Sequence, residues 1–243
     1  MWLNCDLGES FGTWQMGLDS QVMPYLDAAN IACGFHAGDA DVMANTLLLA
    51  KQHNVTIGAH PSYPDKQGFG RRSMQLSKTE LVNCLHYQIA ALDGMAKVHG
   101  LNLHYVKPHG ALYNDMMRDS AILQTVMQAV ASYSPTLKLM LLATQAQSQH
   151  KQLAEQFKLH LLFEAFADRL YDDAGMLVAR SQPNAVHCTE KTLEQVRTLS
   201  QFGYVTTVSN RKLVLNADTL CVHGDNLDAI EHIKQIRALL APV

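Results

Sequence analysis

The feature that most constrains the fold is an alternation of short apolar runs with longer segments of helical period. Most of the runs are nearly continuous rather than alternating in polarity. Continuous apolar runs are typical of strands that are covered on both faces, as in a parallel sheet between helices. The predicted strands are residues 2–7, 28–34, 55–60, 103–108, 137–143, 161–167 and 219–224.

The clearest helical segment begins after Ser77. Ser77 and Glu80 have the spacing of a capping box, in which the two side chains satisfy free backbone N–H groups at the start of a helix. Gly100 offers a natural stop. Between them, four leucines and isoleucines recur at helical spacing and predict one buried face: Leu81, Leu85, Ile89 and Leu92.

Strands that alternate with helices predict a parallel α/β architecture. Seven predicted strands in one uninterrupted series fit a closed or nearly closed barrel better than an open sheet. Residues 205–218 alternate in polarity and turn at Ser209–Asn210, so we expect a hairpin there, before the last strand. The chain has no linker, low-complexity tract or internal repeat, and we expect residues 1–243 to form a single domain.

Polar residues gather at the carboxyl ends of the predicted strands, which is where β/α barrels form their functional sites. Each residue alone has a simpler explanation, such as helix capping for Asp39 and Asp225 or a structural hydrogen bond for a single histidine. Their coincidence at the ends of five or six strands nevertheless predicts a site. The residues are Asn4, Asp6, Glu9, His36, Asp39, His60, Asp65, Arg71, Arg72, Lys107, His109, Glu164, Asp168, Arg169, His223 and Asp225.

Lys107 is the hardest of these residues to explain by packing. It follows a strand that we expect to be buried on both faces, where an unpaired ammonium group is costly. We therefore expect Lys107 to meet a carboxylate or a substrate anion.

These residue types restrict the possible chemistry. Asp6 and the histidines can supply a general acid and base or bind a metal. HExxH is absent, so any metal site must be assembled from separate strands. A Walker sequence is absent as well, but the glycines and arginines of residues 68–72 could hold an anion. The chain has no Gly-x-Ser-x-Gly elbow, and its five cysteines form no CxxC pair.

Charge and hydropathy argue against two classes of partner. The formal net charge is -3 and no basic run occurs, so we expect no nucleic acid to bind. The N-terminus does not resemble a signal peptide, and no apolar run approaches the roughly 20 residues of a membrane helix. We therefore expect no membrane association and a cytoplasmic location.

Six segments strongly resemble the LamB/YcsF family, and they follow the expected order from the first residues nearly to the last. Two departures from the family pattern are small: Ala40 stands where we expect proline, and residues 182–188 are less typical. The segments are LNCDLGESFG (3–12), ANIACGFHAGD (29–39), IGAHPSYPDKQGFGRR (57–72), VKPHGALYN (106–114), FADRLYDDAG (166–175) and CVHGDN (221–226).

The resemblance implies a seven-stranded β/α barrel related to polysaccharide deacetylases. The activity it implies is that of the A subunit of the bacterial ATP-dependent 5-oxoprolinase. That enzyme opens the lactam of 5-oxo-L-proline to give L-glutamate, hydrolyses ATP and requires partner subunits B and C. ATP is therefore an expected cofactor, and Mg²⁺ or another divalent metal is a candidate.

On this basis we predict roles for the strand-end residues. We expect Asp6 with His36 or His60 to transfer protons or activate water, and Lys107 and His109 to stabilise negative charge. The residues that we expect to bind substrate or phosphate are Asn4, Glu9, Arg71, Arg72, Asp168, Arg169 and His223.

Two alternatives remain open at this level. In the first, the chain is a stand-alone metal-dependent deacetylase or amidohydrolase, in which Asp6, His36 and His60 hold a divalent ion that activates water. In the second, the chain is a non-catalytic subunit that binds 5-oxoproline and presents it to another protein.

Overall fold

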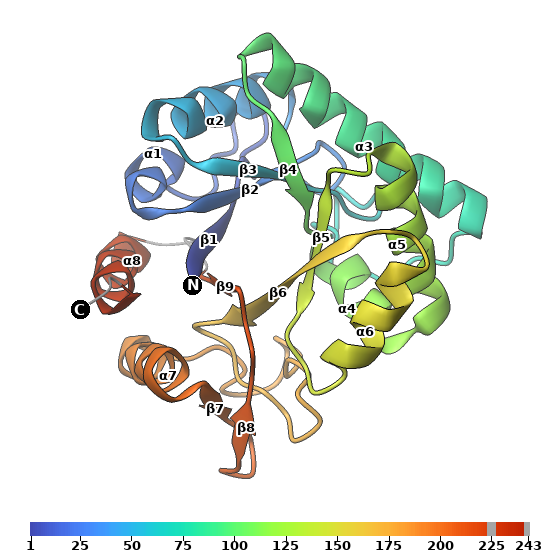
Figure 1. The fold of residues 1–243 in the computed structure, drawn as a ribbon. Coiled ribbons are helices and arrows are strands. Elements are labelled where there is room, and N and C mark those ends of the chain that lie inside the picture. Colours follow the sequence, from blue (N-terminus) through green and yellow to red (C-terminus); the bar gives the residue numbers. More distant parts are fainter. Residues whose placement is uncertain (223–226, 241–243) are drawn as a thin grey trace.

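A computed structural model describes residues 1–222 and 227–240 of the chain. Within these residues, seven parallel strands close into a barrel in the order β1-β2-β3-β4-β5-β6-β9 (Figure 1). The predicted β/α barrel is therefore confirmed. The barrel strands are β1 (Trp2–Leu7), β2 (Ala28–Ala32), β3 (Thr56–His60), β4 (Leu103–Val106), β5 (Lys138–Leu142), β6 (His160–Phe166) and β9 (Thr219–Cys221).

Helices surround the barrel and cover the outer face of its strands (Figure 1). Because β1 pairs with both β2 and β9, the first strand closes the sheet and leaves no open edge. The helices are α1 (Asp19–Val22), η1 (Met23–Tyr25), α2 (Ala40–His53), α3 (Lys78–Val98), α4 (Gly110–Arg118), α5 (Ser120–Tyr133), α6 (Gln147–Glu155), α7 (Thr189–Phe202) and α8 (Leu227–Leu240).

The local signals at α3 and at the hairpin are confirmed. The Ser77 hydroxyl accepts a hydrogen bond from the Glu80 N–H, and the Glu80 carboxylate accepts one from the Ser77 N–H at 2.7 Å. The four residues of the predicted apolar face are all buried. The hairpin consists of β7 (Tyr204–Thr206) and β8 (Lys212–Val214), which pair antiparallel outside the barrel.

The interior of the barrel carries a polar column that rises toward the carboxyl ends of the strands. Asn4 donates a hydrogen bond to Thr219 at 2.7 Å and accepts one from Asn30 at 2.7 Å. Asn30 also donates to Asp6 at 2.8 Å, and it accepts from the Tyr105 hydroxyl at 2.6 Å. Since alternate residues of a strand share a face, Asn4 and Asp6 both point inward, and the column fixes the position of the Asp6 carboxylate.

None of the helices in residues 1–222 and 227–240 is long and apolar enough to cross a membrane. That residues 1–243 form one domain stays a prediction.

Candidate active site

A cavity of about 400 Å³ lies at the carboxyl ends of the barrel strands. It is lined by side chains that follow β1, β3, β4 and β6, so residues distant in sequence meet there. Of the predicted site residues, the lining includes Asp6, Glu9, His60, Arg71, Lys107, His109 and Arg169.

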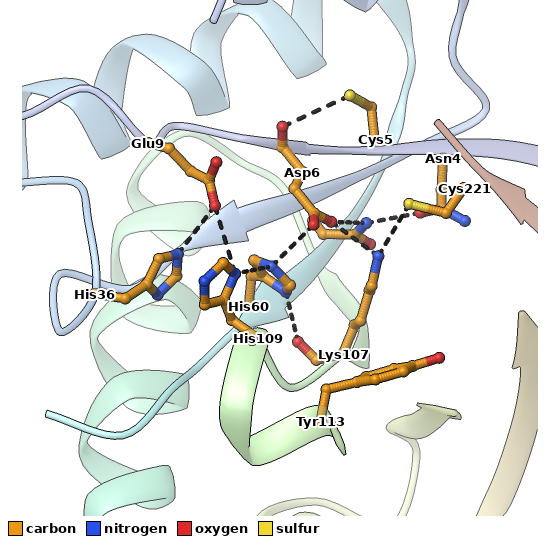
Figure 2. Close-up of polar contacts among 12 residues, drawn as sticks. Asn4, Cys5, Asp6, Glu9, His36, His60, Lys107, His109, Tyr113 and Cys221 are labelled. Carbon is orange, nitrogen blue, oxygen red and sulfur yellow. Dashed lines mark hydrogen bonds and ion pairs between the residues drawn. The ribbon is translucent and has the colours of Figure 1, made fainter. Parts of the chain in front are cut away.

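A buried cluster of three histidines and one glutamate lies at one side of the cavity, and three of its four members line it (Figure 2). One ligand atom from each of Glu9, His36, His60 and His109 lies within 4.8 Å of the others. Glu9 Oε1 is 3.1 Å from His36 Nε2 and 3.5 Å from His109 Nδ1. His109 Nδ1 is in turn 2.9 Å from His60 Nε2. These four side chains converge on one small volume.

The hydrogen bonds behind the cluster assign the tautomers of two histidines. His60 Nδ1 lies 2.7 Å from the Lys107 carbonyl oxygen, and His109 Nε2 lies 2.9 Å from the Phe69 carbonyl oxygen. A carbonyl oxygen only accepts, so both of these nitrogens must carry hydrogen. In the neutral rings the remaining nitrogens then point their lone pairs at each other across 2.9 Å. That arrangement calls for a positive group between them.

Protonation of His36 or His109 is an unfavourable way to supply that positive charge. Burial lowers the pKa of His109 well below its usual value, and the neighbouring His36 and His60 lower it further. Burial, followed by His60, likewise lowers the pKa of His36. The His36 Nδ1 atom is buried and has no hydrogen-bond partner among the described residues. A cation bound by the neutral rings fits this donor set, because metal-ligating histidines commonly donate their other N–H to a carbonyl.

The buried cluster differs in part from the set of metal ligands that the sequence suggested. Sequence reasoning placed Asp6 with His36 and His60, whereas the structure adds Glu9 and His109 to the two histidines in place of Asp6. Asp6 is held elsewhere. Its Oδ1 accepts hydrogen bonds from the Lys107 ammonium at 2.9 Å and from an interior asparagine at 2.8 Å, while Oδ2 lies 3.3 Å from His60 Nε2.

Lys107 meets the carboxylates that its burial requires. Its Nζ lies 2.9 Å from Asp6 and 3.0 Å from Glu164, and its side chain is 2% exposed. Burial disfavours the charged ammonium, but the two carboxylates outweigh this effect and raise the pKa of Lys107 well above its usual value. The nearby Cys221 thiol, 3.3 Å from Nζ, has its own pKa raised by burial and stays protonated. Lys107 therefore adds a fixed positive charge beside Asp6.

The two adjacent arginines take different places. Arg71 lines the cavity, and its guanidinium carbon lies 5.0 Å from the centre of the Phe69 ring. Arg72 instead binds the Asp65 carboxylate through Nε and Nη2 and is largely exposed. This ion pair holds the pKa of Asp65 down at about 2. The predicted anion-binding role therefore fits Arg71, and the described geometry gives Arg72 the structural role of closing its loop.

Three other predicted residues lie outside the lining of the cavity, and a fourth is not among the described residues. Asn4 belongs to the interior column, and His36 lies behind Glu9 with 1% of its surface exposed. The Asp168 carbonyl accepts a hydrogen bond from the His187 N–H at 2.8 Å. His223, like the predicted cap Asp225, falls outside the described residues. Asp39, by contrast, caps α2 as the sequence suggested.

Sequence reasoning missed several residues that meet at the site. Glu164 stood among the strand-end residues but was given no role, although it binds Lys107 and accepts a hydrogen bond from the Tyr113 hydroxyl at 3.1 Å. The buried position of Glu164 inside an apolar strand was the signal that could have identified it. Arg118 and Arg180 also line the cavity, but they lie away from the strand ends and carry no such signal.

Gly70 allows the histidine rings to come together. It adopts a left-handed φ of +63°, and a Cβ built on it would lie 2.9 Å from both His109 Cδ2 and His36 Cβ. Glycine at this position therefore satisfies both the backbone conformation and the close approach of the rings.

We predict that Gly70→Ala lowers the free energy of unfolding by at least about 1–2 kcal/mol, the cost of a left-handed backbone for an L-residue, and that it displaces the rings. Gly94→Ala is the matched control, because Gly94 is exposed near the end of α3 and nothing lies within 4 Å of its built Cβ. This control is expected to raise stability by about 0.5–1 kcal/mol. Urea denaturation measures both effects, and equal stabilities of the two variants would contradict the prediction.

Comparisons with known proteins agree with this architecture. The chain is 52% identical to the A subunit of 5-oxoprolinase from Vibrio campbellii over 98% of this chain and 94% of that protein. It is also 52% identical to the A subunit of 5-oxoprolinase from Pseudomonas fluorescens, over 98% and 96% of the two chains. The crystal structure of the lactam utilization protein from Thermus thermophilus superposes with a TM-score of 0.90 at 37% identity, covering 99% and 95% of the chains.

The match to a family is equally extensive. Residues 1–242 match the LamB/YcsF family. This range includes all six segments that carried the resemblance in the sequence. The chain belongs to the LamB/YcsF family.

Proposed function

We propose that this chain is the lactam-hydrolysing A subunit of a 5-oxoprolinase, which opens 5-oxo-L-proline to L-glutamate. The relatives that are named as this subunit cover nearly the whole chain at 52% identity, and a hydrolase acting on a cyclic amide follows from that name. The observation that carries the proposal is the cavity in which a buried glutamate–histidine cluster lies beside the Asp6–Lys107 pair. Such a site can activate water and stabilise negative charge within one small volume.

We propose further that Glu9, His36, His60 and His109 hold a divalent cation, with Mg²⁺ or a metal that prefers imidazole as candidates. A cation bound there would polarise a carbonyl and lower the pKa of water. The Lys107 and Phe69 carbonyls orient His60 and His109 by accepting their outer N–H groups, which keeps the inner nitrogens available as ligands.

Asp6 is the proposed general base. It lines the cavity, and the Lys107 ammonium lies 2.9 Å from its carboxylate. The second oxygen of Asp6 lies 3.3 Å from His60, so a proton taken from water would be received next to the proposed cation site. As the carbonyl carbon becomes tetrahedral, its oxygen gains negative charge, and the fixed Lys107 ammonium can stabilise that charge at little reorganisation cost.

We place the use of ATP in the assembled enzyme. An unactivated lactam is a poor electrophile, so coupling its opening to ATP hydrolysis is chemically reasonable. The sequence has no Walker motif, and we propose that partner subunits B and C carry or share the handling of ATP. A cytoplasmic location is part of the same proposal.

The test is reconstitution of the chain with ATP, Mg²⁺ and 5-oxoproline, with and without candidate subunits B and C. We expect ADP and glutamate to form in equal amounts only when all subunits are present. ADP and glutamate formed by this chain alone would contradict the proposed need for partners. Binding of 5-oxoproline by the chain, together with full turnover of an assembled Asp6→Asn variant, would favour the non-catalytic binding role.

The glutamate–histidine cluster also favours one other candidate, a stand-alone metal-dependent amidohydrolase or deacetylase. In the same experiment it predicts amide hydrolysis by the metal-loaded chain without ATP and without partners. If the chain releases product only with ATP and the partner subunits, this candidate is excluded.

A further inference from the structure

Arg169 is a buried cation that has no carboxylate partner in the described part of the chain. Its side chain follows β6 and lines the cavity, and the residue is 7% exposed. The guanidinium donates hydrogen bonds to two backbone carbonyls only, those of Val178 at 2.6 Å and Ala185 at 3.3 Å. Arg169 belongs to none of the ion pairs among residues 1–222 and 227–240. A buried cation whose hydrogen bonds go only to backbone carbonyls is costly and favours an anion.

The electrostatic surroundings of Arg169 strengthen this argument. Burial lowers its pKa to about 10, and the positive charge of Arg180 lowers it further, with Asp168 opposing these effects only in part. The guanidinium remains charged at neutral pH. Two cations therefore lie close enough to repel each other beside a cavity, and an anion between them would relieve the repulsion.

Arg180 and Arg118 add further positive charge to the cavity lining that Arg169 belongs to. Both side chains line the same cavity, are solvent-exposed and form no ion pair within the described residues. Arg118 ends α4, and Arg180 lies in the loop between β6 and α7, so the three arginines come from two separate segments.

Arg169 follows a strand that is not adjacent to the strands that precede or carry His36 and His60. In the closed ring of seven strands, β6 is separated from β2 by β1 and β9 in one direction and by β3, β4 and β5 in the other. His36 and His60 follow β2 and β3, whereas Arg169 follows β6. The lining of the same cavity is partly apolar and includes Phe166, Leu177 and Tyr113. A small ring with an anionic substituent fits this arrangement.

We propose that Arg169, Arg180 and Arg118 form an anion subsite that binds an oxyanion group of the ligand and directs its amide toward the histidine cluster. The inference rests on the proposed function in one respect: for 5-oxoproline, the oxyanion is the ring carboxylate. Arginine forks match carboxylate and phosphate geometry and discriminate strongly against a neutral group. The subsite would therefore favour cyclic amides that carry a negatively charged group.

Equilibrium binding to the purified full-length chain, measured by calorimetry, tests the subsite with three probes. These are 5-oxoproline, pyrrolidin-2-one, which has the same ring without the carboxylate, and inorganic phosphate. We expect the wild-type chain to bind 5-oxoproline at least about 10-fold more tightly than pyrrolidin-2-one. We expect Arg180→Gln and Arg118→Gln each to weaken the binding of 5-oxoproline by about 10-fold and to leave that of pyrrolidin-2-one unchanged.

Arg197→Gln is the matched control, because Arg197 is an exposed arginine of α7 that does not line the cavity. Arg169→Lys supplements it, since Arg169 also holds two backbone carbonyls of its loop and a neutral substitution there risks misfolding. The lysine variant keeps the positive charge but loses the two-pronged guanidinium group. We expect it to bind 5-oxoproline more weakly than the wild type and to unfold at the same midpoint.

The phosphate probe separates this inference from the proposed function. If 5-oxoproline fails to bind but phosphate binds in a manner that depends on Arg180, the subsite stands for phosphate and the proposed substrate is wrong. If 5-oxoproline binds equally well to wild type, Arg180→Gln and Arg118→Gln, the subsite is wrong while the proposed function survives. If no anion binds in an Arg180-dependent manner, the subsite is likewise overturned.

Discussion

Lys107→Met is expected to cost about 3–5 kcal/mol of folding free energy at neutral pH, because removing one partner of a buried ion pair leaves uncompensated charge. Here two carboxylates would remain, Asp6 at 2.9 Å and Glu164 at 3.0 Å from the lost ammonium. The pKa of Lys107 is raised in the fold, so its contribution is complete below the pKa of an unfolded lysine, about 10.4, and is lost only as pH rises through the folded pKa. Urea denaturation at neutral pH therefore measures the full effect.

The same substitution should also abolish turnover of the assembled enzyme, since it removes the positive charge beside the proposed general base. The double variant Lys107→Met/Glu164→Gln separates the two effects, because it relieves the repulsion between the carboxylates without restoring the ammonium. We expect it to recover part of the stability and none of the activity. A folded double variant with near-normal turnover would remove Lys107 from the proposed chemistry.

Lys97→Met is the matched control for charge removal. Lys97 pairs with Asp93 at 2.7 Å on the surface of α3, and its side chain is 65% exposed. Surface ion pairs contribute between about 0 and 1 kcal/mol, so the stability of this variant should stay close to that of the wild type. A comparable loss in both lysine variants would contradict the argument from burial.

The fold was predictable because its signals are local or strictly periodic. Continuous apolar runs identified each barrel strand, and the Ser77–Glu80 spacing identified the start of α3. Closure of the ring followed from the number of strands in series. None of these predictions required the direction of a particular side chain in a loop.

The location of the site was predictable for the same reason, but the partners of its residues were not. The sequence places Asp6, Glu9 and His60 at the same end of the barrel, yet the backbone of the loops decides which side chains meet. Glu9 follows Gly8, which has a φ of +71°, and the turned chain brings its carboxylate to the histidines. Asp6 points inward from the strand and meets Lys107 instead.

The arginines illustrate the limit of spacing arguments. Arg71 and Arg72 are adjacent, but Asp65 binds only Arg72, because the loop from Asp65 to Arg72 folds back on itself. Arg180 and Arg118 reach the cavity from positions that no strand-end rule identifies. The positions of arginines in the sequence can thus predict an anion-binding site near the barrel mouth. Which arginines belong to it depends on the tertiary structure.

Glu9→Gln is expected to lower the metal affinity of the chain and to reduce kcat of the assembled enzyme by at least about 10²-fold, the scale of losing one electrostatic contact in the transition state. The amide keeps the size of the carboxylate but removes the negative charge that lies 3.1 Å from His36 Nε2 and 3.5 Å from His109 Nδ1. His36→Ala should behave similarly, because Nε2 is a proposed ligand atom and Nδ1 makes no hydrogen bond within the described residues. Elemental analysis after dialysis against Zn²⁺, Mn²⁺ or Mg²⁺ should find about one ion per wild-type chain and substantially less in both variants.

His104→Ala is the control, because His104 is an exposed histidine of β4 that lies outside the cavity lining. This substitution should change neither metal content nor turnover.

Removal of the metal by a chelator provides an independent test. Turnover of the wild-type complex should fall on removal of the cation and return when the ion is restored, whereas the Glu9→Gln complex should recover little. The inner nitrogens of His60 and His109 lie 2.9 Å apart, and a cation bound to both should stabilise the fold and raise the unfolding midpoint of the wild type. An unfolding midpoint that is insensitive to added metal, together with full turnover after chelation, would rule out the proposed ion and leave Asp6 to act without it.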